Sequence, residues 1–209
     1  YSMNFKVLSL TGLMVLVACS EQSKAVITPK TTVDYAIHIA NPSDDVFHVS
    51  VAVSGLKLEN NLYNFAATAP GTYDNLNFGR FVKSFKALDA KGNIIATEKM
   101  GMNQYKISKP ELVSQLIYDI DDTFGAPESD VLPMGGTDLD SDHVLINTFA
   151  VLGYIEGLQS QPSRLKLTLP KNWQVGTALE LDADGTYHTK NFDHLADSPI
   201  LAGRLTKAQ

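Results

Sequence analysis

Hydrophobic and polar residues alternate along two neighbouring stretches, TVDYAIHIA and VFHVSVAVSG, at residues 32–40 and 46–55. A period of two is typical of strands that bury one face. The intervening segment Asn41–Asp45, NPSDD, has the composition of a turn. We therefore predict an antiparallel hairpin with a five-residue connection. Its inward-facing side chains are Val33, Tyr35, Ile37, Ile39, Phe47, Val49, Val51 and Val53.

Short apolar segments recur along the rest of the chain, separated by turn sequences such as Asp89–Asn93 and Asp182–Gly185. One helix is suggested, Lys109–Ile117 with Pro110 near its start, although SQLIYDI fits a strand equally well. Many short strands without a long amphipathic helix predict an all-β fold. We expect an antiparallel β-sandwich with long loops, the longest over residues 121–142. The further predicted strands are Leu62–Ala67, Arg80–Leu88, Ile94–Lys99, Gln115–Tyr118, Leu145–Tyr154, Leu165–Leu169 and one around Tyr187–His188.

The N-terminal segment has the pattern of a bacterial lipoprotein signal peptide. Lys6 precedes an apolar stretch that is too short for a transmembrane helix, and LVAC then ends on Cys19, followed by polar SEQSK. We expect residues 1–18 to be a signal peptide, Cys19 to be lipidated and residues 19–31 to be a tether. An ordinary signal peptide with an incidental cysteine is the alternative. The expected location is the bacterial cell envelope, with a lipid anchor as the contact to the membrane.

Composition and charge exclude several classes of protein. The chain has 209 residues, of which 44% are hydrophobic, which suits one folded domain over residues 32–205. The formal net charge is −6 and no cluster of Lys or Arg is present, so a nucleic-acid partner is not expected. A single cysteine excludes a disulfide within the chain.

Motifs for catalysis or metal binding are missing. None of the five histidines lies in an H-E-x-x-H pair, and neither a G-x-S-x-G elbow nor a P-loop occurs. Asp138, Asp140 and Asp142 resemble the start of a calcium loop, but His143 replaces its glycine and Phe149 its bidentate glutamate. We interpret this stretch as a solvated acidic loop. We expect no cofactor or metal in this chain.

Four segments occur in an order that resembles the N-terminal domain of the glycyl aminopeptidase family of zinc peptidases. They are YAIHIANPSDDVFHVSVAV, APGTYDNLNFGRFVKSFKALDAKGN, LTLPKNWQVGTAL and NFDHLADSPILAG. The resemblance covers about residues 32–205. The matching positions are Pro70, Gly71, Tyr73, Asn77, Phe78, Gly79 and Arg80, then Pro170, Trp173, Thr177 and Leu179, and finally Leu195, Asp197, Ser198, Pro199 and Gly203.

The resemblance implies a β-sandwich that precedes a thermolysin-like catalytic domain. In that family the zinc ligands and the glutamate base lie in the catalytic domain, so no catalytic residue is carried over to this chain. Zinc is expected only in that other domain, and we expect this chain to be inactive alone. The implied partner is the catalytic domain of the same polypeptide, with residues 206–209 at the start of a further segment.

The loop at Pro70–Asn75 has two interpretations. Gly71 permits a close turn, and Pro70 fixes its entry. One interpretation is structural, with Tyr73 packing at the end of the sandwich. The other is functional, with the loop facing the catalytic domain and lining its substrate cleft, where a peptide substrate is a candidate ligand. The candidate cleft or interface residues are Pro70, Gly71, Tyr73, Asp74 and Arg80.

Two functions of different classes are therefore open. The first is the non-catalytic N-terminal domain of a lipid-anchored zinc aminopeptidase, which packs against the catalytic domain and shapes its cleft. The second is a free-standing envelope lipoprotein that binds a peptide or protein partner. The first predicts an exposed apolar surface for the neighbouring domain, for which the candidates are Tyr73, Leu76, Ile200 and Leu201.

Overall fold

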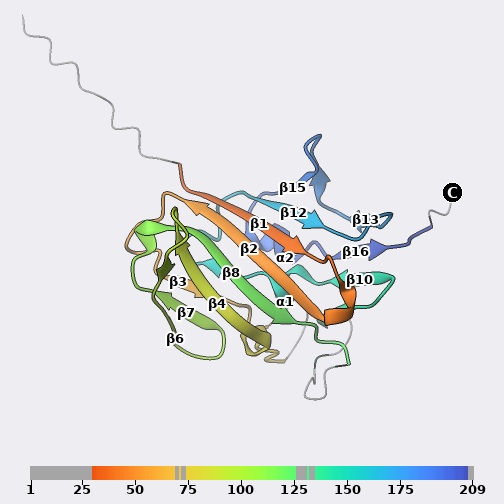
Figure 1. Ribbon diagram of the computed structural model, residues 1–209, viewed down its shortest axis with the longest axis horizontal. Helices are drawn as coiled ribbons and strands as arrows, with labels where there is room; N and C mark the ends of the chain where they lie inside the picture. The colour runs from red at the N-terminus through yellow and green to blue at the C-terminus, as the bar shows by residue number, and fades with distance from the viewer. Residues whose placement is uncertain (1–29, 69–70, 72–73, 126–130, 132–134, 207–209) are drawn as a thin grey trace, which may run out of the picture.

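The chain forms three β-sheets and a few short helices in the computed structural model, which describes residues 30–68, 71, 74–125, 131 and 135–206 (Figure 1). The large sheet has the order β14 (Glu180–Leu181), β15 (Thr186–Thr189), β12 (Ser163–Thr168), β1 (Thr32–His38), β2 (Val46–Ser54), β8 (Val113–Asp121), β4 (Val82–Asp89), β5 (Ile94–Ile95). One small sheet has the order β13 (Gln174–Thr177), β16 (Ile200–Gly203), β10 (His143–Ile146), β9 (Thr137–Leu139). The other has the order β11 (Tyr154–Ile155), β3 (Leu62–Asn64), β7 (Gln104–Ile107), β6 (Thr97–Lys99).

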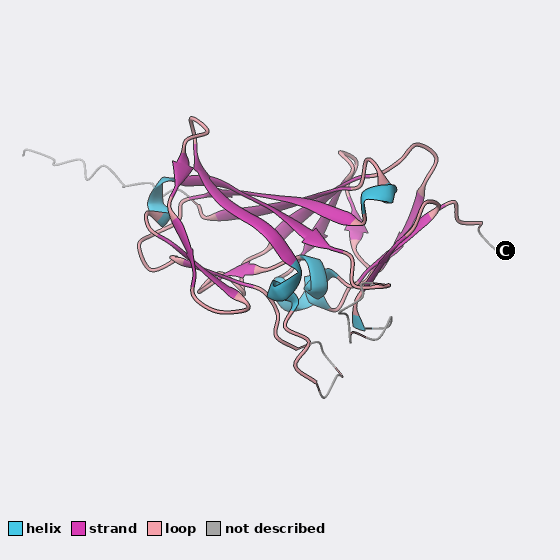
Figure 2. Ribbon diagram, turned by 60° about the horizontal axis from the view of Figure 1, so that its bottom comes forward, coloured by secondary structure: helices cyan, strands magenta, loops and turns pink. Residues whose placement is uncertain are grey.

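The helical segments are all short. Among the described residues, the α-helices are α1 (Thr148–Val151) and α2 (Phe192–Ala196), and 3₁₀ turns are formed by η1 (Pro42–Asp44), η2 (Phe78–Phe81) and η3 (Pro110–Leu112). Figure 2 shows both small sheets and the α-helices on the same side of the large sheet. None of the helices in the described part of the chain is long and apolar enough to cross a membrane.

Alternation of buried and exposed residues produces this layering. Every second residue of β1 and β2 is buried, and the predicted inward-facing set from Val33 to Val53 is confirmed in full. These side chains join residues from both small sheets in one hydrophobic core. The opposite face of the large sheet carries the polar residues of the same strands and lies outside this core, which leaves it open to solvent.

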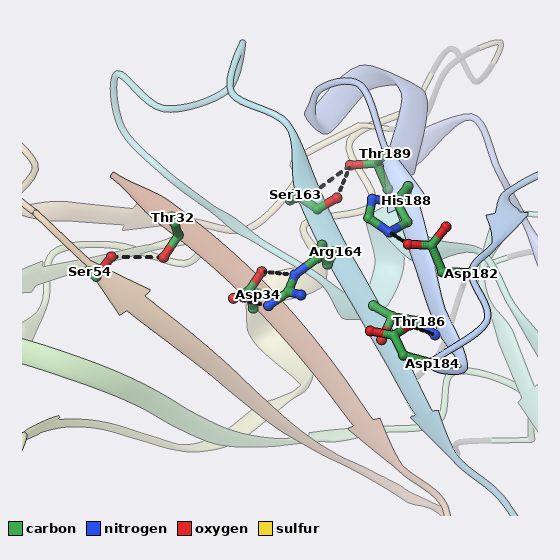
Figure 3. Close-up of polar contacts among 10 residues, drawn as sticks. All are labelled: Thr32, Asp34, Ser54, Ser163, Arg164, Asp182, Asp184, Thr186, His188 and Thr189. Atoms are coloured by element: carbon green, nitrogen blue, oxygen red, sulfur yellow. Dashed lines mark hydrogen bonds and ion pairs between the residues drawn. The ribbon is translucent and has the colours of Figure 1, made fainter. Parts of the chain in front are cut away.

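The mostly β fold is confirmed, but two details of the predicted hairpin sheet differ. The connection between β1 and β2 is longer than predicted, residues 39–45, because η1 occupies its centre. The sheet is also not purely antiparallel, because β1 pairs with β12 in parallel. Arg164 of β12 donates two hydrogen bonds of 2.9 Å each to the Asp34 carboxylate of β1, so an ion pair bridges the parallel strands (Figure 3).

One suggested and one predicted element were wrong. The suggested helix Lys109–Ile117 is the short turn η3 followed by β8, which confirms the alternative of a strand over SQLIYDI and the predicted strand Gln115–Tyr118. The predicted strand Leu145–Tyr154 is split into β10, α1 and β11, because the chain turns inward there and buries all four α1 residues. The predicted loop 121–142 contains β9, and the predictions also missed β7, β13, β14, β16 and α2.

Three buried tyrosines hold the segment that follows α1. The Tyr35 hydroxyl donates to the Gly153 carbonyl at 2.9 Å, and the Tyr118 hydroxyl donates to the Val151 carbonyl at 3.0 Å. The Gly153 N–H donates to the Tyr63 hydroxyl at 3.2 Å, and the Tyr63 and Tyr118 hydroxyls are 3.1 Å apart. Burial raises the pKa of all three phenols, so they remain neutral donors. We call Tyr35, Tyr63, Tyr118 and Gly153 the tyrosine hub.

Gly153 leaves no room for a side chain in this hub. A Cβ there would lie 2.4 Å from the Asn64 carbonyl oxygen and 2.5 Å from a Tyr63 ring carbon. We predict that Gly153→Ala lowers the free energy of unfolding by about 3 kcal/mol, at the upper end of overpacking costs. Gly101→Ala is the matched control, because a Cβ at Gly101 meets nothing within 4 Å. It should change the stability by less than about 0.5 kcal/mol in urea denaturation. Equal stabilities of the two variants would contradict the tight packing at Gly153.

Candidate functional site

The residues that follow the predicted loop Pro70–Asn75 lead through η2 into β4, at the end of the large sheet where β4 begins and β8 ends (Figure 1). Pro70 and Tyr73 lie outside the described residues. Gly71 is exposed with a φ of 77°, in the left-handed region that glycine adopts without strain. Asp74 is also exposed, and its carboxylate accepts a hydrogen bond of 2.8 Å from the Asn75 N–H.

Hydrogen bonds close the base of this loop. The N–H groups of Asn77 and Phe78 donate to the carbonyls of Ala67 and Ala66 at 2.9 and 3.0 Å. Asn77 has a φ of 52°, a left-handed conformation that asparagine tolerates better than most residues. Asn103 holds both sides of the turn: its Nδ2 donates to Asn77 Oδ1 at 2.7 Å, and its Oδ1 accepts from the Gly79 N–H at 3.0 Å.

The next three residues of the motif have separate roles. Phe78 is fully buried and packs against Phe149, with ring centroids 5.6 Å apart. Gly79 must be glycine, because a Cβ would lie 2.3 Å from the Met102 carbonyl oxygen. Arg80 is exposed, with its guanidinium 4.7 Å from the centre of the Phe81 ring. The motif thus anchors the loop with two residues and presents a cation beside it.

A second long loop begins nearby, after β8, and a buried polar network closes it. The N–H groups of Thr123 and Thr137 each donate to the other threonine's hydroxyl, at 3.0 and 2.7 Å. The Thr137 hydroxyl donates in turn to the Asp122 carboxylate at 2.5 Å. Burial raises the pKa of Asp122, although the hydrogen bonds from Thr137, Leu139 and Thr123 oppose this shift. Gly136 packs so closely that a Cβ would lie 2.0 Å from the Thr123 hydroxyl.

One small apolar cluster joins the two loops. It contains Leu76 and Phe78 from the first loop, Val131 from the second, and Phe149 and Ala150 from α1. It lies apart from the main core, and Ala66, Phe81 and Ala196 pack against it. We call the two loop bases with this cluster the loop end of the domain. Two large apolar side chains near it are exposed, Met102 at 53% and Phe124 at 52%.

Some residues predicted to be exposed are buried, and one polar network was not predicted. Leu76 and Ile200, predicted to be exposed, are buried at 7% and 0%, because Leu76 joins the apolar cluster and Ile200 faces the main core. Leu201, the next residue along β16, is 41% exposed. Cys19 and Tyr73 lie outside the described residues. The Asp122–Thr123–Thr137 network was missed, since its members read as loop residues in the sequence.

Two further motif segments have structural roles. Trp173 packs partly buried against the main core after the turn that starts at Pro170, and its N–H donates to the Pro170 carbonyl at 3.3 Å. Gly203 lies so close to the neighbouring strand that a Cβ would be 2.7 Å from the Asp142 carbonyl oxygen. Both segments therefore contribute to the packing of the fold.

The histidine and aspartate clusters offer no catalytic arrangement. Asp119 accepts from His48 Nδ1 at 2.7 Å and from the Ser84 hydroxyl at 3.0 Å. Because Ser84 donates to the carboxylate and not to the imidazole, this group lacks a serine activated by a base. His143 contacts Asp142 and Asp138 at 2.8 and 3.3 Å in the acidic loop. Within residues 30–206, where described, no group of three or more His, Cys, Asp or Glu side chains is placed to hold a metal ion.

Comparison with known proteins adds a family to this geometry. Residues 34–204 match the family described as the peptidase M61 N-terminal domain. The chain is similar in structure to an aminopeptidase N family protein from Idiomarina loihiensis, with a TM-score of 0.74 and 20% identity. The match covers 84% of this chain and 30% of that protein, so the chain spans less than a third of its length. No curated protein gives a significant match.

Asn103 provides a test of the closed loop base. We predict that Asn103→Ala costs about 1–2 kcal/mol of stability, because the Gly79 N–H loses its acceptor. The amide of Gly79 should also exchange faster with solvent, since its local opening becomes easier. Asn61→Ala is the control, because the Asn61 side chain makes no hydrogen bond with the described residues. Amide exchange by NMR is the measurement, and unchanged protection at Gly79 would contradict the assignment.

Proposed function

The chain belongs to the family of peptidase M61 N-terminal domains, and from this membership we propose that it is the non-catalytic N-terminal part of a lipid-anchored zinc aminopeptidase. Its role is to pack against a catalytic domain of the same polypeptide and to shape the substrate cleft. The observation that carries this proposal is the family match, which extends over residues 34–204. The similar Idiomarina loihiensis protein, an aminopeptidase N family member, is much longer than this chain and supports a neighbouring domain.

The loop end is the surface that we assign to the catalytic domain. The bases of two loops are fixed there, so the described residues at those bases can form contacts without a large ordering cost on association. Exposed Met102 and Phe124 supply apolar contacts, and exposed Arg80 and Asp74 supply charges at the rim. This composition resembles that of inter-domain contacts, which are more polar than permanent subunit interfaces. A peptide substrate bound at this boundary would meet Arg80 and Asp74.

We expect the zinc of the complete enzyme to lie in the catalytic domain. A catalytic zinc site needs three protein ligands converging on one point, and no such group occurs among the described residues. The proposal therefore assigns the zinc, and the activation of water that zinc supplies when bound, entirely to the catalytic domain. The role that we assign to the residues of this chain is to bind and orient the peptide substrate and to enclose it at the domain boundary.

The lipid anchor is the part of the proposal that rests on the sequence alone. Cys19 follows LVA and precedes a polar tether. We predict that the wild-type protein incorporates a labelled fatty acid and sediments with membranes, and that Cys19→Ser abolishes both. Ser20→Ala is the control, because it changes the residue next to Cys19 and leaves the cysteine of the LVAC motif intact. Membrane sedimentation of a processed Cys19→Ser protein, without label, would contradict lipidation.

The cleft role is tested in the complete peptidase, after the reading frame beyond Gln209 has been determined. An H-E-x-x-H motif is expected there, whereas a stop codon would favour the free-standing lipoprotein. In the complete enzyme we predict that Arg80→Ala raises KM for a peptide substrate at least about threefold with kcat nearly unchanged, as for a residue that only binds substrate.

The control for this experiment lies at the opposite end of the same strand. Lys91 is exposed in the turn after β4, whereas Arg80 lies just before β4, so Lys91→Ala removes a charge far from the loop end. It should leave both kinetic constants unchanged. Thermal melting of both variants separates a kinetic effect from unfolding. Identical KM values for Arg80→Ala, Lys91→Ala and wild type would remove Arg80 from the cleft.

A further inference from the structure

A hollow of about 240 Å³ lies on the outer face of the large sheet, away from the main core. It lies where β1, β2, β8 and β4 run side by side. One row across these strands is formed by His38, His48, Asp119 and Ser84, each paired in register with the next. The adjacent row places Ser50 opposite Ile117, and Ile117 opposite Lys86. Small side chains at Ser50 and Ser84 between longer neighbours explain why the surface is hollowed here.

The one carboxylate that lines the hollow already has hydrogen-bond partners. Asp119 accepts hydrogen bonds from His48 at 2.7 Å and from Ser84 at 3.0 Å. The hydrogen bond to Asp119 raises the pKa of His48, against a smaller opposing effect of burial. His48 is also within 3.5 Å of the Asp44 carboxylate. The carboxylates of Asp119 and Asp44 therefore already have hydrogen-bond partners, His48 for both and Ser84 for Asp119.

Three other side chains that can donate hydrogen bonds line the hollow without a direct partner. The side chains of Lys86, His38 and Ser50 line it, and none of them makes a direct hydrogen bond or ion pair with a described residue, although the charge of Lys86 contributes to lowering the pKa of Asp119. Elsewhere on the same face, Arg164 forms an ion pair with Asp34, and the His188 ring lies 2.5 Å from the Asp182 carboxylate (Figure 3). Lys166, opposite Ala36 in the neighbouring strand, adds a further positive charge close to the hollow. The side-chain donors without a direct partner thus gather around the hollow on this face of the sheet.

From this cluster we propose that the hollow binds an anionic oxygen group, the chemistry that carboxylates and phosphates share. Lys86 supplies the charge, and His38 and Ser50 supply directed hydrogen bonds. Lysine binds such groups as a point charge, and a charge-assisted hydrogen bond is stronger than a neutral one. The net charge of −6 gives the whole molecule no general attraction for anions, so binding must be local. This site is independent of the loop end and of the proposed function.

The test is an NMR titration of the ¹⁵N-labelled protein with sodium phosphate, at constant ionic strength maintained with chloride. Shifts are expected at the amides of Ser50, Ser84 and Asp119. Lys86→Gln should weaken the apparent affinity at least fivefold, and His38→Gln should weaken it by a smaller factor. Lys91→Gln, a lysine removed from the turn beyond β4, should leave the affinity unchanged. Dispersed spectra of each variant show that it is folded.

The source of the anion is separated by two further titrations. Acetate producing shifts at the same amides would show that a carboxylate suffices. Sedimentation with phosphatidylglycerol vesicles that Lys86→Gln abolishes would identify a lipid headgroup, and phosphate shifts without sedimentation would identify a soluble anion. Shifts scattered over the surface, or equal affinities of wild type and Lys86→Gln, would overturn the proposal.

Discussion

The need to satisfy a polar backbone inside an apolar core constrains this fold most strongly. The chain leaves α1 and crosses the interior at residues 151–153, where water cannot reach its carbonyl and amide groups. The hydroxyls of Tyr35, Tyr63 and Tyr118 supply the missing partners. These tyrosines come from β1, β3 and β8, so one small network fixes the large sheet, one small sheet and the segment after α1 relative to each other. Each unsatisfied group would cost about 1–3 kcal/mol.

The loop end depends on this arrangement. Phe149 and Ala150 belong to α1, which shortly precedes Gly153 of the tyrosine hub. Leu76, Phe78 and Val131 pack with them in the small apolar cluster. The position of α1 therefore determines where both long loops are anchored. Close packing at Gly79 and Gly136 then fixes the two bases, because neither position admits a Cβ. A surface built in this way is stiff at its base, which suits a domain that must hold a fixed position against a neighbour.

The two faces of the large sheet differ in composition: the inner face packs in the core, and the outer face carries polar and charged side chains. The inner face supplies the alternating apolar residues of the main core. The outer face holds its charges in pairs such as Arg164 with Asp34, and such exposed pairs contribute little to stability. The hollow around Lys86 interrupts this pairing. A substitution there should therefore affect ligand binding without unfolding the protein.

The sequence by itself determined the local structure and the family. The alternating pattern of residues 32–54 specified the first hairpin and its buried face, because strand periodicity is a local property. The Asn77–Arg80 motif identified the turn that closes the first loop. Tertiary structure decided what depends on contacts between distant residues. The parallel pairing of β1 with β12 joins residues about 130 apart in sequence. Likewise, Ile200 and Leu201 are neighbours of equal hydrophobicity, yet one is buried and the other exposed, because a strand turns successive side chains to opposite faces. The tyrosine hub and the Asp122 network are also invisible in the sequence, since their polar atoms meet only when separate strands pack together.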